Sequence, residues 1–176
     1  MKITFSGKYE HNYNPKKNSM DVSSKEVALS SGIILLTYIV IIVLVGYLKG
    51  VPIPYLIESR LALVMVFLSI PLHEFLHIIV FPRQSHIKIF YSLFAIIFVS
   101  DIKLSKCRAF IVSFLPLTVL SLLPLLIYFV YFDSFSQESR DFLLTFSFFS
   151  AMGSANDVWI IKFMLQLPKG EQIDFS

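Results

Sequence analysis

The sequence is poor in charged residues and in cysteine. Only 15% of its 176 residues are charged, whereas a water-soluble domain carries roughly a quarter. The hydrophobic fraction is 56% and the mean hydropathy is +0.73. This balance excludes an ordinary soluble domain and predicts that lipid surrounds most of the chain. The single cysteine, Cys107, excludes an intrachain disulfide and a cysteine-based zinc cage, so histidine and carboxylate side chains must hold any metal.

The sequence also lacks the strong positive charge of a nucleic-acid-binding protein. Its net charge is only +3, and its basic residues are scattered between apolar runs. We therefore expect no nucleic-acid partner. The expected partners are the lipid bilayer and a membrane protein substrate, and the basic residues are expected to set the topology.

Four apolar runs are each about 20 residues long, which is enough to cross a hydrocarbon core of about 30 Å. They cover about 29–48, 61–81, 109–132 and 142–165. The sequence therefore predicts an all-α integral membrane protein with about four transmembrane helices. Its predicted parts are a polar cytoplasmic arm over 1–28, a transmembrane domain over 29–167 and a short polar tail over 168–176. Prolines inside the third run, Pro116 and Pro124, predict kinks whose freed backbone groups bond to neighbouring helices.

The segment 87–100 is ambiguous. Its uncharged part, 89–100, is only 12 residues long, which is short for a spanning helix and favours a re-entrant or β-hairpin element. With four spans, 12 of the 15 Lys and Arg residues fall on one side, whereas a fifth span would leave 8 and 7. The positive-inside rule therefore favours four spans and a multi-pass protein of the cell membrane with both termini in the cytoplasm.

The second apolar run contains His73-Glu74-Phe75-Leu76-His77, a match to the H-E-x-x-H pattern. Residues four apart on a helix differ by only about 40° around its axis, so both imidazoles can bind one zinc ion. Glu74 lies about 100° from His73 and could act as a general base without being a ligand. The alternative is a set of paired or snorkelling polar residues, but ionisable groups at membrane depth usually serve a function.

A hydrolytic zinc site normally has three protein ligands, so the pattern requires one more. The candidates of suitable chemistry are Asp157, His86, His11, Asp101, Glu58 and Asp141. Depth in the membrane favours Asp157. At 1.5 Å per residue, Asp157 lies roughly 12 Å below the cytoplasmic end of its span. The two histidines lie roughly 6–12 Å below the cytoplasmic end of their own span, which is a similar depth. A neutral, hydrogen-bonded Asp157 is the alternative.

Small and polar residues surround Asp157, over Gly153-Ser154-Ala155-Asn156. They permit a close helix approach or a local break that admits water. Asn156 could donate to the ligand carboxylate or to an oxyanion, or it could form only an interhelical hydrogen bond. Pro71, two residues before His73, would loosen its helix in a similar way.

These motifs resemble the putative zincin peptidase family of small bacterial membrane proteins, which is distantly similar to site-2 intramembrane zinc metalloproteases. The segments that carry the resemblance are 73–77, Lys106-Cys107-Arg108 with Pro116, and 154–158. The resemblance implies that His73, His77 and Asp157 bind Zn²⁺ and that Glu74 is the catalytic base. Val158 follows Asp157, where site-2 proteases typically carry glycine.

The sequence therefore predicts a membrane-embedded zinc peptidase that hydrolyses a membrane-spanning or membrane-adjacent protein near the cytoplasmic face. The segment 87–100 could offer a strand edge to an unwound substrate, or it could only pack against the helices. The alternative function is a catalytically inactive binding or regulatory protein that retains the zincin-like fold and uses small residues such as Gly153 as its contact face. A transporter is less favoured, because all the deep ionisable residues lie at one depth.

Overall fold

The structure, a computed structural model, describes residues 2–6, 24–50, 59–91, 96–100, 102–166, 168 and 172–173. Its helices are α1 (Ser24–Lys49), α2 (Arg60–Ile79), α3 (Lys106–Leu117), α4 (Leu123–Val130), α5 (Gln137–Gly153) and α6 (Ala155–Gln166). A π-helical turn, η1 (Thr118–Leu122), joins α3 to α4, and a short 3₁₀ turn, η2 (Phe132–Ser134), follows α4. The strands are β1 (Lys2–Ser6), β2 (His86–Tyr91), β3 (Ile96–Ser100), β4 (Leu104–Ser105) and β5 (Gln172–Ile173).

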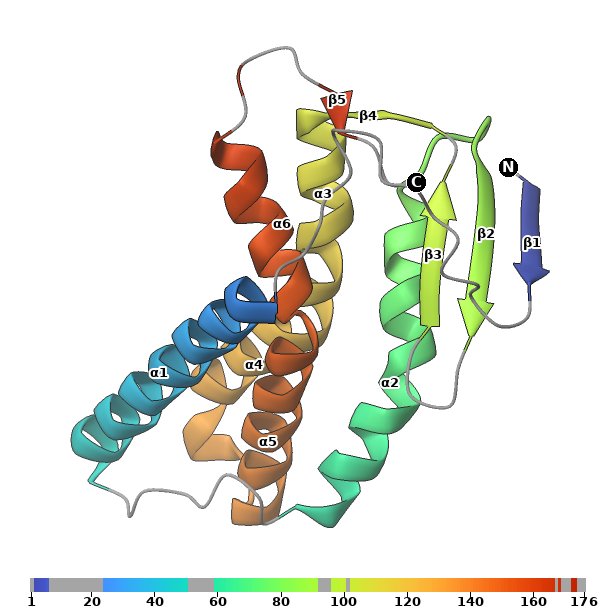
Figure 1. The fold of residues 1–176 in the computed structure, drawn as a ribbon. Helices are drawn as coiled ribbons and strands as arrows, with labels where there is room; N and C mark the ends of the chain where they lie inside the picture. The colour runs from blue at the N-terminus through green and yellow to red at the C-terminus, as the bar shows by residue number, and fades with distance from the viewer. Residues whose placement is uncertain are drawn as a thin grey trace.

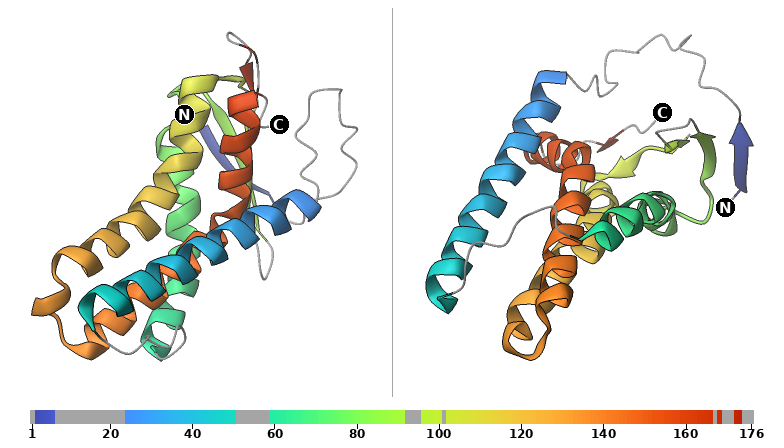
Figure 2. Two further views of the ribbon diagram at one scale, coloured as in Figure 1. Left: turned by 90° about the vertical axis from the view of Figure 1, so that its left-hand side faces the viewer. Right: turned by 90° about the horizontal axis from the view of Figure 1, so that it is seen from below.

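The long helical elements alternate in direction (Figure 1). α1 runs downward, α2 upward, the continuous α3–η1–α4 element downward, and α5 with α6 upward. α5 lies between α1 and α2, with which it makes contacts on its two sides (Figures 1 and 2). The end of α2, the start of α3 and the end of α6 therefore lie at the same end of the bundle.

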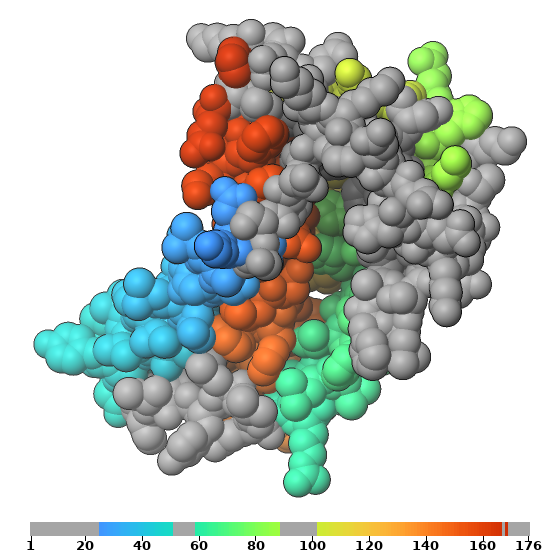
Figure 3. Space-filling model, in the orientation of Figure 1, coloured from blue at the N-terminus to red at the C-terminus, as the bar shows by residue number. Residues whose placement is uncertain are grey.

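Three helical segments of the described chain are long and apolar enough to cross a membrane: 25–49, 60–79 and 106–130. Large apolar side chains of α1 and α2, such as Leu36 and Phe67, are exposed, and both helices lie at the surface of the molecule (Figure 3). The predicted helical frame is thereby confirmed. The predicted fourth run, 142–165, is divided by a break at Ser154 into α5 and α6, so the number of spans stays a prediction.

The described residues of the ambiguous segment 87–100 form strands. β2 and β3 pair antiparallel, with Ile87 opposite Ser100, so the β-hairpin alternative is confirmed. β1 adds to the other edge of β2 in parallel, with Lys2 opposite His86. This strand was not predicted, because it lies in the N-terminal arm and pairs with a distant segment. Two further short strands, β4 and β5, pair antiparallel and join the start of α3 to the chain that follows α6.

The bundle has two apolar cores. One lies between α1, α4, α5 and the start of α6, and is built around Ile42, Leu125 and Phe148. The other lies between the end of α2, α3, α6 and the strands, and is built around Ile78, Val112 and Met164. Each core therefore joins segments that are far apart in the sequence.

A buried cluster of hydroxyl groups from Tyr38, Ser121 and Ser147 lies beside the first core. Ser147 Oγ donates to the backbone carbonyl of Ser121 at 2.8 Å, and Tyr38 Oη lies 2.5 Å from Ser147 Oγ and 2.8 Å from Ser121 Oγ. With that donation fixed, Tyr38 donates to Ser147 and accepts from Ser121, so every proton has an acceptor. The carbonyl of Ser121 belongs to η1, next to Pro124, so this cluster satisfies a backbone group beside the predicted kink.

Candidate metal centre

The two histidines are presented by α2. Ser59 caps this helix, because its side chain accepts a hydrogen bond from the N–H of Ala62 at 3.2 Å. Regular helix continues to Ile79, although Pro71 lies inside it. His73 and His77 therefore lie one turn apart on one face, with their rings edge to face and their centroids 4.8 Å apart.

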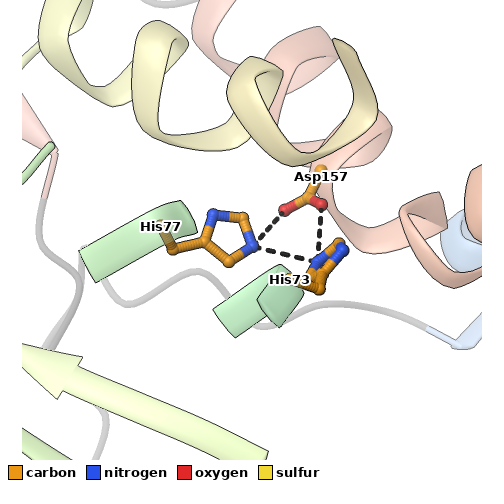
Figure 4. Close-up of side chains that lie close together, drawn as sticks. All are labelled: His73, His77 and Asp157. Carbon is orange, nitrogen blue, oxygen red and sulfur yellow. Dashed lines mark hydrogen bonds and ion pairs between the residues drawn. The ribbon is translucent and has the colours of Figure 1, made fainter. Parts of the chain in front are cut away.

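The break between α5 and α6 positions Asp157. α5 ends at Gly153, and α6 begins at Ala155, so Asp157 occupies the first turn of α6. A carboxylate is favourable there, because the N-terminal end of a helix carries partial positive charge. Asp157 is 96% buried, with 4% of its surface exposed, and its carboxylate points at the two imidazoles (Figure 4). The local break that the small residues permit is thus present, and it lies three residues before the carboxylate.

The three side chains converge on one point (Figure 4). His73 Nε2 lies 3.2 Å from Asp157 Oδ2, and His77 Nε2 lies 3.3 Å from Asp157 Oδ1. The two Nε2 atoms are 3.1 Å apart. In the described part of the chain, these three residues form the group of histidine and acidic side chains that could hold a metal ion.

The arrangement of lone pairs fits a cation. His77 Nδ1 lies 2.9 Å from the backbone carbonyl of Val112; since a carbonyl can only accept, Nδ1 is the donor. A neutral His77 then has a lone pair at Nε2, which faces the Asp157 carboxylate. Asp157 Oδ2 is buried and accepts no hydrogen bond from any described residue. Two acceptors, Nε2 of His77 and the Asp157 carboxylate, thus face one another, and either a proton on His73 Nε2 or a metal ion can lie between them.

The spacing also fits zinc. Bonds of about 2.0–2.1 Å in tetrahedral geometry place neighbouring ligand atoms about 3.3 Å apart. The three separations here run from 3.1 to 3.3 Å. Two imidazoles and a carboxylate are also a suitable donor set, which leaves a fourth position for water or substrate.

Glu74 lies beside this group. Its side chain is partly buried, and it is close enough to His73 and Asp157 for its charge to interact with theirs. It is separate from the three convergent residues, so it is available for proton transfer. Asn156 precedes Asp157 in α6, and its side chain is exposed; its role beside the metal or an oxyanion stays a prediction.

The other candidate ligands are either elsewhere or outside the described residues. His86 begins β2 and is exposed. Asp141 is buried in the first half of α5, where it accepts a hydrogen bond from Gln137 Nε2 at 2.7 Å. His11, Glu58 and Asp101 lie outside the described residues. The structure therefore brings Asp157, and neither His86 nor Asp141, to the histidine pair.

Sequence reasoning missed the carbonyl of Val112. A backbone acceptor in an apolar helix leaves no mark in the side-chain pattern. The one available signal was Pro116, four residues later, because proline lacks the N–H that would normally occupy that carbonyl.

Comparison with known proteins identifies a family for this chain. No curated protein and no solved structure matched the chain. A family model described as "Putative zincin peptidase" matches residues 66–171, more than half of the chain. The matched region contains both histidines, Glu74 and Asp157. The resemblance seen in the sequence is thereby confirmed, and the chain belongs to the putative zincin peptidase family.

Proposed function

We propose that this protein is a membrane-embedded zinc peptidase that cleaves a membrane-spanning or membrane-adjacent protein near the cytoplasmic face. The observation that carries the proposal is the convergence of His73, His77 and Asp157, with a buried carboxylate oxygen that accepts no hydrogen bond from the described residues. Membership of a family of metallopeptidases supports the same chemistry.

In this proposal, His73, His77 and Asp157 hold the zinc ion. When bound, zinc supplies Lewis acidity that polarises the scissile carbonyl and activates water. Glu74 accepts the proton of the water as its oxygen attacks the carbonyl carbon, and delivers that proton to the amine as the C–N bond breaks. The hydrogen bond from His77 to the Val112 carbonyl holds one imidazole in the orientation that this chemistry requires.

The substrate must be extended at the site. A transmembrane helix hides its carbonyls in hydrogen bonds, so a segment of it has to unwind before it can be cleaved. β3 is one of the two edge strands in the sheet order β1-β2-β3, and it contacts α2, the helix that carries the histidines. The backbone of β3 could hold an extended segment by strand addition.

The cytoplasmic location rests on charge. The N-terminal arm (1–28), the region between the second and third apolar runs (82–108) and the C-terminal region (162–176) contain 12 of the 15 Lys and Arg residues, and positive charge favours the cytoplasmic side. The end of α2 and the start of α3 lie at the same end of the bundle (Figure 1), and His77 is two residues before the end of α2. We therefore place the site nearer to the cytoplasmic face.

Metal content of the detergent-purified protein, measured by plasma mass spectrometry, tests the ligand set. We expect about one zinc per chain in the parent and in Glu74→Gln, and loss of zinc in His73→Ala and Asp157→Asn. Asp141→Asn is the matched control, because Asp141 is also a buried aspartate but hydrogen-bonds to Gln137. Zinc retained in full by Asp157→Asn would show that this ligand set is wrong.

A second measurement tests peptidase activity. Membranes that contain either the parent or Glu74→Gln are compared by mass spectrometry for newly formed peptide termini. The proposal expects termini that depend on Glu74. A protein that binds zinc through the three ligands, yet produces no such termini, would be a binding or regulatory protein with a zincin-like fold.

A further inference from the structure

We propose that Pro116 is a positioning residue for His77. Because proline has no backbone N–H, it leaves the Val112 carbonyl available to the imidazole, and this contact directs Nε2 of His77 toward Asp157. The inference rests on the proposed function for the role of the metal, but its geometry is present without one.

The first step of the argument is the helix ladder. In a regular α-helix the carbonyl of residue i accepts the N–H of residue i+4, so the usual donor to Val112 would be residue 116. Pro116 lies inside α3, lacks that donor, and its ring pushes against the same carbonyl. The Val112 carbonyl therefore lacks its usual donor within the helix and needs another.

The second step is the identity of the new donor. His77 Nδ1 of α2 lies 2.9 Å from the Val112 oxygen. Val112 is 0% exposed, Pro116 is among the fully buried residues, and apolar side chains of the second core surround the contact. A hydrogen bond in such surroundings is strong, and an unpaired group there is costly. The imidazole and the carbonyl thus satisfy each other across two helices.

The third step is the tautomer. A neutral imidazole carries its proton on only one nitrogen. Donation from Nδ1 leaves a lone pair on Nε2, which lies 3.3 Å from Asp157 Oδ1 and 3.1 Å from His73 Nε2. If residue 116 had an N–H, that group would compete for the Val112 carbonyl. His77 could then move its proton to Nε2 and donate to Asp157, which would block the lone pair that a metal needs.

The first experiment reads the tautomer in the metal-free protein. The ¹⁵N signals of labelled histidine are recorded in bilayers at alkaline pH, and the His77 signals are assigned by their loss in His77→Gln. We expect the Nδ1–H form in the parent and a larger share of the Nε2–H form in Pro116→Ala. Pro124→Ala is the matched control, because Pro124 lies in the same apolar run but four residues after Leu120 of η1; it should keep the parent tautomer.

A rescue variant separates this role from a merely structural kink. The lactic acid analogue of alanine at position 116 replaces the backbone N–H by an ester oxygen, so it lacks both the proline ring and the donor. We expect it to restore the parent tautomer. A Nε2–H form that persists in the ester variant would mean that the shape of the proline ring, and not its missing N–H, sets the tautomer, and the inference would be overturned.

Zinc affinity, measured by competition with a chelator, gives a second readout. We expect Pro116→Ala to bind zinc about 10- to 100-fold more weakly than the parent, and the ester variant and Pro124→Ala to match the parent. A parent that shows the Nε2–H form, or a Pro116→Ala variant with an unchanged tautomer, would overturn the inference whether or not zinc binds. A parent with the expected tautomer but no zinc affinity would support the positioning role while contradicting the proposed function.

Discussion

Two buried polar clusters lie inside this apolar bundle, and they differ in their balance of protons. In the hydroxyl cluster of Tyr38, Ser121 and Ser147, every proton has an acceptor. In the candidate metal centre, Asp157 Oδ2 accepts no hydrogen bond from the described residues, although Nε2 of His73 lies 3.2 Å away. The hydroxyl cluster satisfies its own hydrogen bonds and so can hold helices together, whereas the facing acceptors of the second cluster leave a place that a metal ion can fill.

The two clusters also connect different parts of the bundle. The hydroxyl cluster joins α1, η1 and α5 beside the first core. The metal centre joins α2 to α6, and through His77 and Val112 also to α3. Changes in the first cluster should therefore affect stability, and changes in the second should affect metal binding and activity.

The largest effect is expected from Glu74→Gln. General acid–base catalysis contributes about 10²- to 10⁴-fold to the rate, so formation of Glu74-dependent peptide termini should fall by that factor while zinc content stays at the parent level. The rate is followed by quantitative mass spectrometry of membranes. An unchanged rate would assign proton transfer to another group.

The next effect is expected from Asp157→Asn. Removal of a charged ligand should weaken zinc binding by more than the roughly 10- to 100-fold that loss of an outer partner costs. Affinity is measured by chelator competition in detergent. Ser147→Ala, a change in the hydroxyl cluster, is the control and should bind zinc as the parent does; weaker binding by this variant would show that the two clusters are coupled.

Zinc itself should stabilise the folded protein. A ligand that binds only the folded state adds about 2.7 kcal/mol at a free concentration about 100 times its Kd. Thermal unfolding in detergent, with and without a chelator, should show this difference in the parent and in Tyr38→Phe. Asp157→Asn should show a much smaller difference, because its zinc affinity is weaker, and a difference as large as that of the parent would show that zinc binds without Asp157.

The smallest of these effects is expected from Tyr38→Phe. This change leaves a buried serine hydroxyl without its partner, and interhelical hydrogen bonds in membrane proteins contribute about 0.6 kcal/mol on average and at most about 1.7 kcal/mol. The free energy of unfolding should fall by that amount, with no change in zinc affinity. Tyr47→Phe is the control, because Tyr47 lies on the same helix and is exposed. Equal losses in both variants would show that the hydroxyl cluster contributes nothing specific.

Much of the helical frame could be predicted, because long apolar runs have few solutions in lipid. The same physics led to Asp157, since a rise of 1.5 Å per residue places residues of two spans at comparable depth. The structure brings Asp157 to the histidine pair. Its break at Ser154 follows from small residues that the sequence displays directly.

Other features could not be predicted, because they depend on the backbone or on distant pairing. β1 pairs in parallel with β2, with Lys2 opposite His86, although the two strands are far apart in the sequence. A short strand in a polar arm carries no pattern that identifies so distant a partner. The π-turn η1 has no such pattern either, and the Ser121 carbonyl finds its donor on α5, a helix that is distant in the sequence. The acceptor role of the Val112 carbonyl could not be predicted for the same reason, because a sequence pattern describes side chains and not backbone groups.

The separation of the metal ligands along the chain has a consequence for biosynthesis. His73 and His77 lie in α2, whereas Asp157 lies in α6, the last helix of the described chain. A nascent chain is made from its N-terminus, so the histidine pair leaves the ribosome long before the carboxylate. The candidate metal centre is therefore complete only after the rest of the bundle has been made, and an unfinished chain lacks the carboxylate that this site needs.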